Sequence, residues 1–170
     1  FKTIVADRSA SMDTFNGKQY DMVEHLLQDA QKQAIETQKS TVVTLVAFDN
    51  TANDIMRDRD LLTEDIPLRQ EIVNGLRPCA STRFNDTLIE EVEKLEKQKN
   101  DYLSSLQHSV RKLNPDVAIV LIAITDGDDN ASNNGRKQTR EKMLSFRKNG
   151  GRAILMAANM DAEEVGGWYG

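Results

Sequence analysis

The sequence has a single cysteine, Cys79, and only two histidines, His25 and His108. One cysteine excludes a disulfide within the chain and fits a reducing compartment. The two histidines lie far apart and lack the spacing of zinc ligands, so a zinc site is not expected. Apolar runs of membrane-spanning length and a signal peptide are also missing. We therefore expect a cytoplasmic protein. An extracellular location stays open, because the chain starts at Phe1 and we expect it to be part of a longer protein.

An excess of basic charge is missing as well. Lys and Arg number 22 against 27 Asp and Glu, which gives a net charge of −5. Proteins that bind nucleic acid through its phosphates carry clustered Lys and Arg, so a nucleic-acid partner is not expected. The 170 residues are enough for one domain with a real core and too few for two. We expect a single domain over residues 1–170.

Runs of apolar and β-branched residues predict five strands. Residues 41–48 read TVVTLVAF, which is typical of a strand covered on both faces. The most apolar run, VAIVLIAIT at 117–125, predicts the central strand. A weaker run after Asp49-Asn50 suggests an exposed strand antiparallel to the one before it. The expected strands are residues 2–7, 41–48, 53–58, 117–125 and 152–158.

Apolar residues at spacings of three and four predict the helices between these strands. One helical face carries Tyr20, Val23, Leu27, Ala30 and Ala34. The expected helices are residues 18–37, 67–76, 85–113, 136–149 and a last one from 161 onward. The 85–113 pattern is longer than a strand, so the helix either projects past the sheet or breaks; we favour a break or bend near Asn100-Asp101.

Alternating helices and buried strands predict an α/β domain, doubly wound around a mostly parallel sheet, with helices on both faces and one antiparallel edge strand. In such sheets, binding sites form beyond the carboxyl ends of the strands, where the strand order reverses. Polar residues that directly follow a strand are therefore the first candidates for a site.

The stretch TIVADRSASM at 3–12 carries such residues. Asp7, Ser9 and Ser11 follow the first strand at alternate positions. One carboxylate and two hydroxyls form the all-oxygen set that hard divalent cations prefer, although plain turn chemistry uses the same residues. Asp126 stands at the end of the 117–125 strand, and Thr82 lies in a short loop before a helix. If the first strand and the 117–125 strand are neighbours, all five side chains meet on one rim, where a cation relieves the repulsion between the carboxylates.

This pattern resembles the metal-ion-dependent adhesion site of von Willebrand factor A domains. The matching residues are Asp7-x-Ser9-x-Ser11, then Thr82, then Asp126-Gly127 in ITDG. The segments TLVAFDN, STRFNDTL, IAITDGDDNAS and ANMDA resemble an intracellular bacterial and phage-type branch of the family. The resemblance covers nearly the whole chain and implies a Rossmann-like fold.

For the site, the resemblance implies Mg²⁺ held directly by Ser9 and Ser11, with Thr82 as a further candidate, while Asp7 and Asp126 bind largely through water. Mn²⁺ or Ca²⁺ would be substitutes. It also implies that a protein partner supplies an Asp or Glu to the metal, and a second copy of this chain is one candidate partner.

The motif departs from the family in its small residues. Ala10 stands where many members have glycine, and the threonine loop reads Ala80-Ser81-Thr82, so both loops have less backbone freedom. Arg8 has two interpretations, a clamp for an incoming carboxylate or a structural salt bridge, and we favour the salt bridge. Asp128 and Asp129 are interpreted as solvent-exposed turn residues rather than further ligands.

Cys79 precedes the threonine loop. It could line the rim, but we interpret it as a small packed thiol.

Two classes of function fit these residues. The first is a non-enzymatic, Mg²⁺-dependent protein-binding module. The second is a metal-dependent phosphoryl-transfer or phosphoacceptor domain with Asp7 as the nucleophile. The second lacks a glycine-rich phosphate loop and an acid two residues after Asp7, so we favour a binding module that is not an enzyme.

Overall fold

Five strands form one sheet in the order β3-β2-β1-β4-β5. The computed structural model describes residues 1–113, 115–126, 129–157, 167 and 169. The strands are β1 (Lys2–Asp7), β2 (Val42–Phe48), β3 (Ala52–Asp60), β4 (Ile119–Thr125) and β5 (Gly151–Ala157). Each strand lies within two residues of its expected bounds, so the apolar runs located the sheet correctly.

The order of the strands in the sheet reverses at β1. It runs from β1 to β2 and β3 on one side, and β4 and β5 extend the sheet on the other side. β1 pairs in parallel with both β2 and β4, β4 pairs in parallel with β5, and β3 is antiparallel to β2. The predicted antiparallel edge strand is confirmed, and β1 and β4 are neighbours, as a shared rim requires. β1 is the central strand of the five, so the prediction that residues 117–125 form the central strand is wrong.

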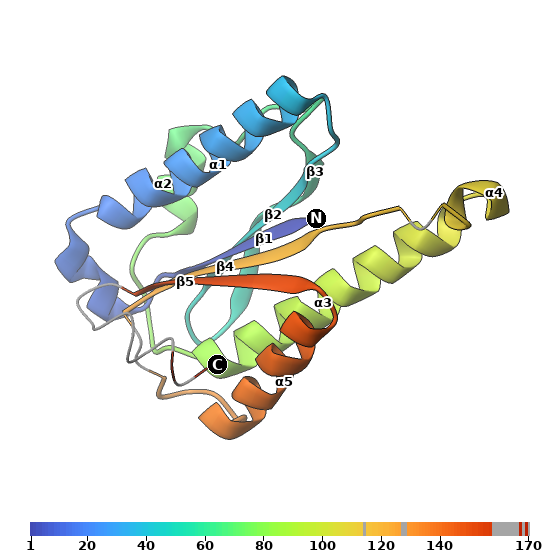
Figure 1. The fold of residues 1–170 in the computed structure, drawn as a ribbon. Coiled ribbons are helices and arrows are strands. Elements are labelled where there is room, and N and C mark those ends of the chain that lie inside the picture. Colours follow the sequence, from blue (N-terminus) through green and yellow to red (C-terminus); the bar gives the residue numbers. More distant parts are fainter. Residues whose placement is uncertain (114, 127–128, 158–166, 168, 170) are drawn as a thin grey trace.

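Helices cover both faces of the sheet (Figure 1). On one face lie α1 (Lys18–Thr37) and α2 (Arg69–Gly75), and on the other lie α3 (Phe84–Ser105) and α5 (Arg136–Lys148). Alternate side chains of β1 enter the two cores: Ile4 packs on the α1 side and Val5 on the α3 side. The doubly wound α/β class is therefore confirmed, and β1 is buried on both faces, as its apolar run predicts.

The predicted face of α1 is nearly the observed one. Val23, Leu27, Ala30 and Ala34 are buried, while Tyr20 is half-buried. The helix ends at Thr37. The next residue, Gln38, has a left-handed backbone conformation, and its N–H bonds carbonyls of the last turn. None of the helices that the structure describes is both long and apolar enough to span a bilayer.

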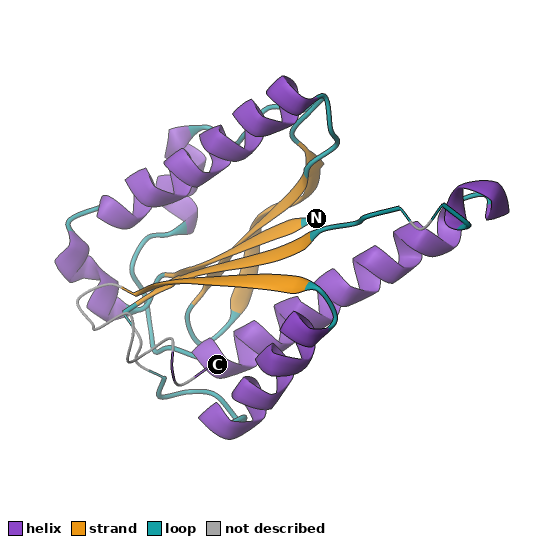
Figure 2. Cartoon of the chain, in the orientation of Figure 1, coloured by secondary structure: helices purple, strands orange, loops and turns teal. Residues whose placement is uncertain are grey.

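The predicted break near Asn100-Asp101 is wrong. α3 runs without interruption through both residues to Ser105, and its 22 residues extend roughly 33 Å, past the end of the sheet (Figure 2). An ion pair between Lys97 and Asp101, one turn apart, supports the helix at that point. The Tyr102 ring packs edge-on against Phe1 at a centroid distance of 5.8 Å. The ion pair and the contact with Phe1 therefore outweigh the weak helix propensity of Asn and Asp.

After Leu106 the chain forms the short helix α4 (His108–Arg111), in the part that projects furthest from the sheet in Figure 1. Leu113, the last residue of the expected 85–113 helix, lies beyond α4 and is 80% exposed. The expected helix from 161 onward lies outside the described residues, except for Gly167 and Tyr169.

Candidate metal centre

The candidate ligands gather at the carboxyl ends of β1 and β4, on the left in Figure 1. Asp7 is the last residue of β1, and Asp126 directly follows β4. Ala6 pairs with Ile124, so the next pair along the two parallel strands is Asp7 beside Thr125. The two carboxylates that sequence reasoning assigned to one rim therefore lie on the same edge of the sheet, on adjacent strands.

Asp7 is fully buried. Its Oδ1 accepts a hydrogen bond from the Ser9 N–H at 2.7 Å, and its Oδ2 accepts one from the Thr125 hydroxyl at 2.8 Å. The pKa of Asp7 is raised to about 6, mainly by burial and also by the charge of Asp126, against the lowering effect of these hydrogen bonds. Without a cation, ionising this carboxylate at neutral pH therefore costs free energy.

Asp126 supplies an oxygen that is ready for a ligand. Its Oδ1 is buried and accepts no hydrogen bond from the residues that the structure describes. A buried carboxylate oxygen without a donor is unfavourable unless a proton or a cation satisfies it. Together with the nearby charge of Asp7, it makes this end of the sheet attractive to a cation.

Ser9 and Ser11 add two hydroxyls beside these carboxylates. After Ser9 the chain turns into the 3₁₀ helix η1 (Ala10–Phe15), which places Ser11 in its first turn. The two hydroxyl oxygens lie 3.0 Å apart. Ser9 is buried and Ser11 is exposed, so the pair reaches from the floor of the site to the surface.

Thr82 reaches the same rim through its loop. The Ala10 N–H donates to the Ala80 carbonyl at 3.2 Å, and the Cys79 N–H donates to the Arg8 carbonyl at 2.7 Å, so the threonine loop lies directly on the β1–η1 loop. Thr82 itself is buried. Within the described residues it makes no direct hydrogen bond to the other four candidate ligands, and the backbone contacts alone bring it near them.

Ala80 occupies a conformation that usually belongs to glycine, with φ of 47°. A residue with a Cβ is disfavoured there by roughly 1–2 kcal/mol. The family pattern has glycine in this loop, so the departure noted in the sequence falls on a position where glycine would relieve strain. The hydrogen bond from Ala10 to its carbonyl helps to hold the strained turn in place.

Arg8 is a structural residue, as favoured from the sequence. Its guanidinium lies 2.9 Å from the Asp49 carboxylate and also donates to the Gly75 carbonyl at 3.3 Å. Both partners belong to neighbouring parts of the fold, at the ends of β2 and α2. Arg8 therefore ties the β1–η1 loop to the body of the domain.

The interpretation of Cys79 as a packed thiol is wrong, because Cys79 is exposed. Its backbone N–H bonds the Arg8 carbonyl, so the exposed thiol lies beside the β1–η1 loop. Asp129 is a turn residue, as predicted, since its carboxylate accepts the Ser132 N–H at 3.1 Å, but it is half-buried and also accepts the Asn85 N–H at 2.8 Å. Asp128 and Gly127 lie outside the described residues.

Sequence reasoning missed two residues of this region. Thr125 donates to Asp7, and Asn130 accepts the Thr82 N–H through its Oδ1 at 2.9 Å. The strand register carries a signal for Thr125, because aligning TIVAD with LIAIT places it beside Asp7. Asn130 has no comparable signal, since it is one of several asparagines in the polar run DDNASNNG.

The donors suit a hard divalent cation. In the described part of the chain, no group of three or more His, Cys, Asp or Glu side chains could hold a metal. A site here would therefore consist of two carboxylates and three hydroxyls, the oxygen donors that Mg²⁺ accepts together with water. Such a cation would bind the unsatisfied Asp126 oxygen and would stabilise the ionised form of Asp7, whose pKa is raised in its absence.

No protein-family model and no curated protein matches the sequence. Solved structures do match. Proximal thread matrix protein 1 from the mussel byssus, with a zinc-occupied MIDAS motif, superimposes over 99% of this chain with a TM-score of 0.61 at 15% identity. Another crystal form of it gives 0.58 at 16% identity. The chain spans 40% of the length of those mussel chains.

BatB from Bacteroides thetaiotaomicron matches 92% of this chain and 65% of its own, with a TM-score of 0.50 at 14% identity. At these identities the likeness concerns the fold, which agrees with the strand order and with the helices on both faces of the sheet. This chain has the fold of a von Willebrand factor A domain.

Proposed function

We propose that this chain is a non-enzymatic binding module that holds Mg²⁺ through Asp7, Ser9, Ser11, Thr82 and Asp126 and docks an acidic side chain of a protein partner on the metal. The observation that carries the proposal is the carboxylate pair at the ends of adjacent strands. Asp7 is buried with a raised pKa, and Asp126 has a buried oxygen without a donor. The zinc-occupied MIDAS motif of the mussel protein supports a divalent cation in this fold.

The neutral donors explain why the metal would attract an acid. Ser9, Ser11 and Thr82 contribute no charge. Asp7 and Asp126, acting largely through water, would offset the charge of the cation only in part. A carboxylate from a partner would supply an anionic oxygen of the kind that Mg²⁺ prefers. The rim that faces such a partner consists of residues 8–14, 79–84 and 129–134, together with 127–128, which lie outside the described residues.

The burial of Asp7 favours a binding module over a phosphoacceptor. Both oxygens of Asp7 accept hydrogen bonds, and its side chain is fully buried. A nucleophilic carboxylate must reach the phosphorus atom of its substrate, and this one is turned toward Ser9 and Thr125 instead. Asp7 is thus placed to hold and orient the polar groups of the rim.

Calorimetric titration of Mg²⁺ tests the metal. We expect wild-type protein to bind and Asp7→Ala to show no binding while it stays folded by circular dichroism. Asp13→Ala is the matched control, because Asp13 is an exposed acid on η1 close by in sequence, and it should bind like wild type. Equal Mg²⁺ binding by wild type and Asp7→Ala would contradict the proposal.

Docking of an acid is tested with acetate as the probe. We expect acetate to shift the amide NMR signals of Ser9 and Ser11 when Mg²⁺ is present and to leave them unchanged in EDTA. The same shifts in EDTA would show that the carboxylate binds without the metal. For a protein partner, changing its candidate Asp or Glu to the amide should abolish Mg²⁺-dependent binding.

A further inference from the structure

Thr82 is held on both sides of its backbone by one other loop. Its N–H donates to the Asn130 side chain at 2.9 Å, and its carbonyl accepts the N–H groups of Asn130 and Ala131, each at 3.0 Å. Thr82 is buried, so these bonds satisfy groups that water does not reach. The position of the Thr82 backbone therefore depends on the loop that contains Asn130.

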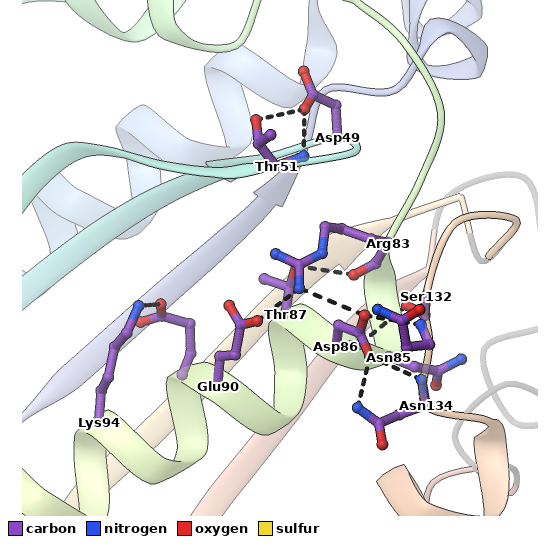
Figure 3. A network of polar contacts seen from close by, with 12 residues as sticks. Asp49, Thr51, Arg83, Asn85, Asp86, Thr87, Glu90, Lys94, Ser132 and Asn134 are labelled. Atoms are coloured by element: carbon purple, nitrogen blue, oxygen red, sulfur yellow. Dashed lines mark hydrogen bonds and ion pairs between the residues drawn. The ribbon is translucent and has the colours of Figure 1, made fainter.

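Hydrogen bonds join that loop to the first turn of α3, and each side contributes one aspartate as an acceptor. Figure 3 shows Asp86 of the helix beside Asn134 of the loop. Asp129 of the loop accepts the Asn85 N–H at the start of the helix. Asp86 of the helix accepts the N–H groups of Asn133 and Asn134, each at 2.9 Å, and the Asn134 side-chain amide at 2.7 Å. We call residues 85, 86 and 129–134 the clamp.

Asp86 is an ionised anchor of the clamp. It is only 3% exposed, and burial acts to raise its pKa. The hydrogen bonds from Asn133 and Asn134 and the charge of Arg83 outweigh that effect, so the pKa of Asp86 lies below its ordinary value. Charge-assisted hydrogen bonds of this kind are among the stronger ones in proteins, which makes the clamp a rigid support.

We propose that Asn130 is a positioning residue of the candidate metal centre and that it acts through Thr82. This inference rests on the proposed function. Asn130 lies four residues after Asp126. The segment that follows β4 therefore carries one candidate ligand, Asp126, and also the side chain that binds the backbone of another, Thr82. The clamp thereby fixes the backbone of Thr82, which lies in a different loop from Asp126.

The test is a double-mutant cycle on Mg²⁺ affinity, measured by calorimetry on the full chain. Changing a residue that orients a metal ligand typically weakens binding by about tenfold to a hundredfold. We expect Asn130→Ala to weaken Mg²⁺ binding by at least roughly tenfold, and Thr82→Ala to weaken it comparably. The double variant should be no weaker than Thr82→Ala, because Asn130 has no route to the metal once the threonine hydroxyl is gone.

Asn149→Ala is the control, an asparagine outside the clamp and the rim. Asn149 directly follows α5 and is exposed, and its side chain makes no hydrogen bond to the described residues. We expect its Mg²⁺ affinity to equal that of wild type. Thermal unfolding of each variant identifies a temperature at which all are folded, and the titrations are run there.

Amide hydrogen exchange gives a readout that needs no metal. In EDTA, the Thr82 amide should exchange faster in Asn130→Ala than in wild type, and Asn130→Asp, which keeps the accepting oxygen, should restore its protection. Wild-type Mg²⁺ affinity in Asn130→Ala would overturn the inference, and so would additive losses in the double variant. Failure of wild type itself to bind Mg²⁺ would overturn the proposed function as well, so the two failures are distinguishable.

Discussion

Asp7→Asn should make the metal-free domain more stable at neutral pH. The pKa of Asp7 is raised from 3.8 to about 6 in the folded protein, with burial as the main cause. Each pKa unit corresponds to about 1.4 kcal/mol, so a shift of this size is equivalent to as much as ~3 kcal/mol. Asparagine keeps the shape and an oxygen that accepts the Ser9 N–H, and it removes the buried charge.

The direction of the pH dependence follows from which state holds the proton. Between pH 3.8 and about 6 the folded carboxyl is still protonated while the unfolded one is ionised, so the folded state binds more protons. The stability that protonated Asp7 contributes is therefore complete below pH 3.8 and is lost as the pH rises through about 6. The Asp7→Asn variant would show no such loss, so the difference between variant and wild type grows with pH.

Urea unfolding in EDTA at several pH values between 4 and 8 measures this difference. We expect nearly equal free energies of unfolding at the acid end and a variant that is more stable by up to ~3 kcal/mol at the neutral end. Adding Mg²⁺ should narrow the gap, because it stabilises only wild type. A gap that does not change with pH, or an Asp7→Asn variant that is less stable at pH 8, would refute the reasoning.

Three further results are expected. Gly151→Ala should destabilise the fold by roughly 1–3 kcal/mol in urea unfolding, because a Cβ there would lie 2.5 Å from the Phe146 ring; an unchanged midpoint would show that the ring moves freely. Arg8→Gln should lower the unfolding midpoint at neutral pH, since it leaves the buried Asp49 carboxylate without its ion pair, and a midpoint equal to that of wild type would contradict this role. No phosphate ester should be hydrolysed with Mg²⁺ or Mn²⁺, and a phosphatase activity that disappears in Asp7→Asn would favour the enzymatic alternative.

The sheet was predictable because a strand that is buried on both faces consists of a continuous run of apolar residues. TVVTLVAF and VAIVLIAIT needed no tertiary information to be recognised as strands, and the reversal of strand order then placed Asp7 and Asp126 together. The bounds of α3 were less predictable. The stabilisation at Asn100-Asp101 comes from an ion pair and from an aromatic contact with Phe1, a residue about a hundred positions away.

The roles of side chains in the polar loops were the hardest to predict from the sequence. Asn130 and Asn133 are the same residue type in the same loop, yet one holds Thr82 through its side chain and the other has an exposed side chain without a hydrogen bond in the described structure. Likewise, nothing in the local sequence marks Cys79 as exposed rather than packed. Such roles depend on which residues of a neighbouring loop a side chain meets, and local turn propensity does not predict those contacts.

β1 pairs on both sides and is covered on both faces, so the floor of the rim belongs to a strand that is constrained on every side. A change of partner that required Asp7 to move would disrupt two strand pairings and both cores. Many residues around that floor have exposed side chains in loops or in η1, such as Ser11 and Asp13, where substitutions disturb neither core. A lineage or an engineer can therefore vary the contacts of the rim while the floor stays constant, so recognition can diversify without a new fold.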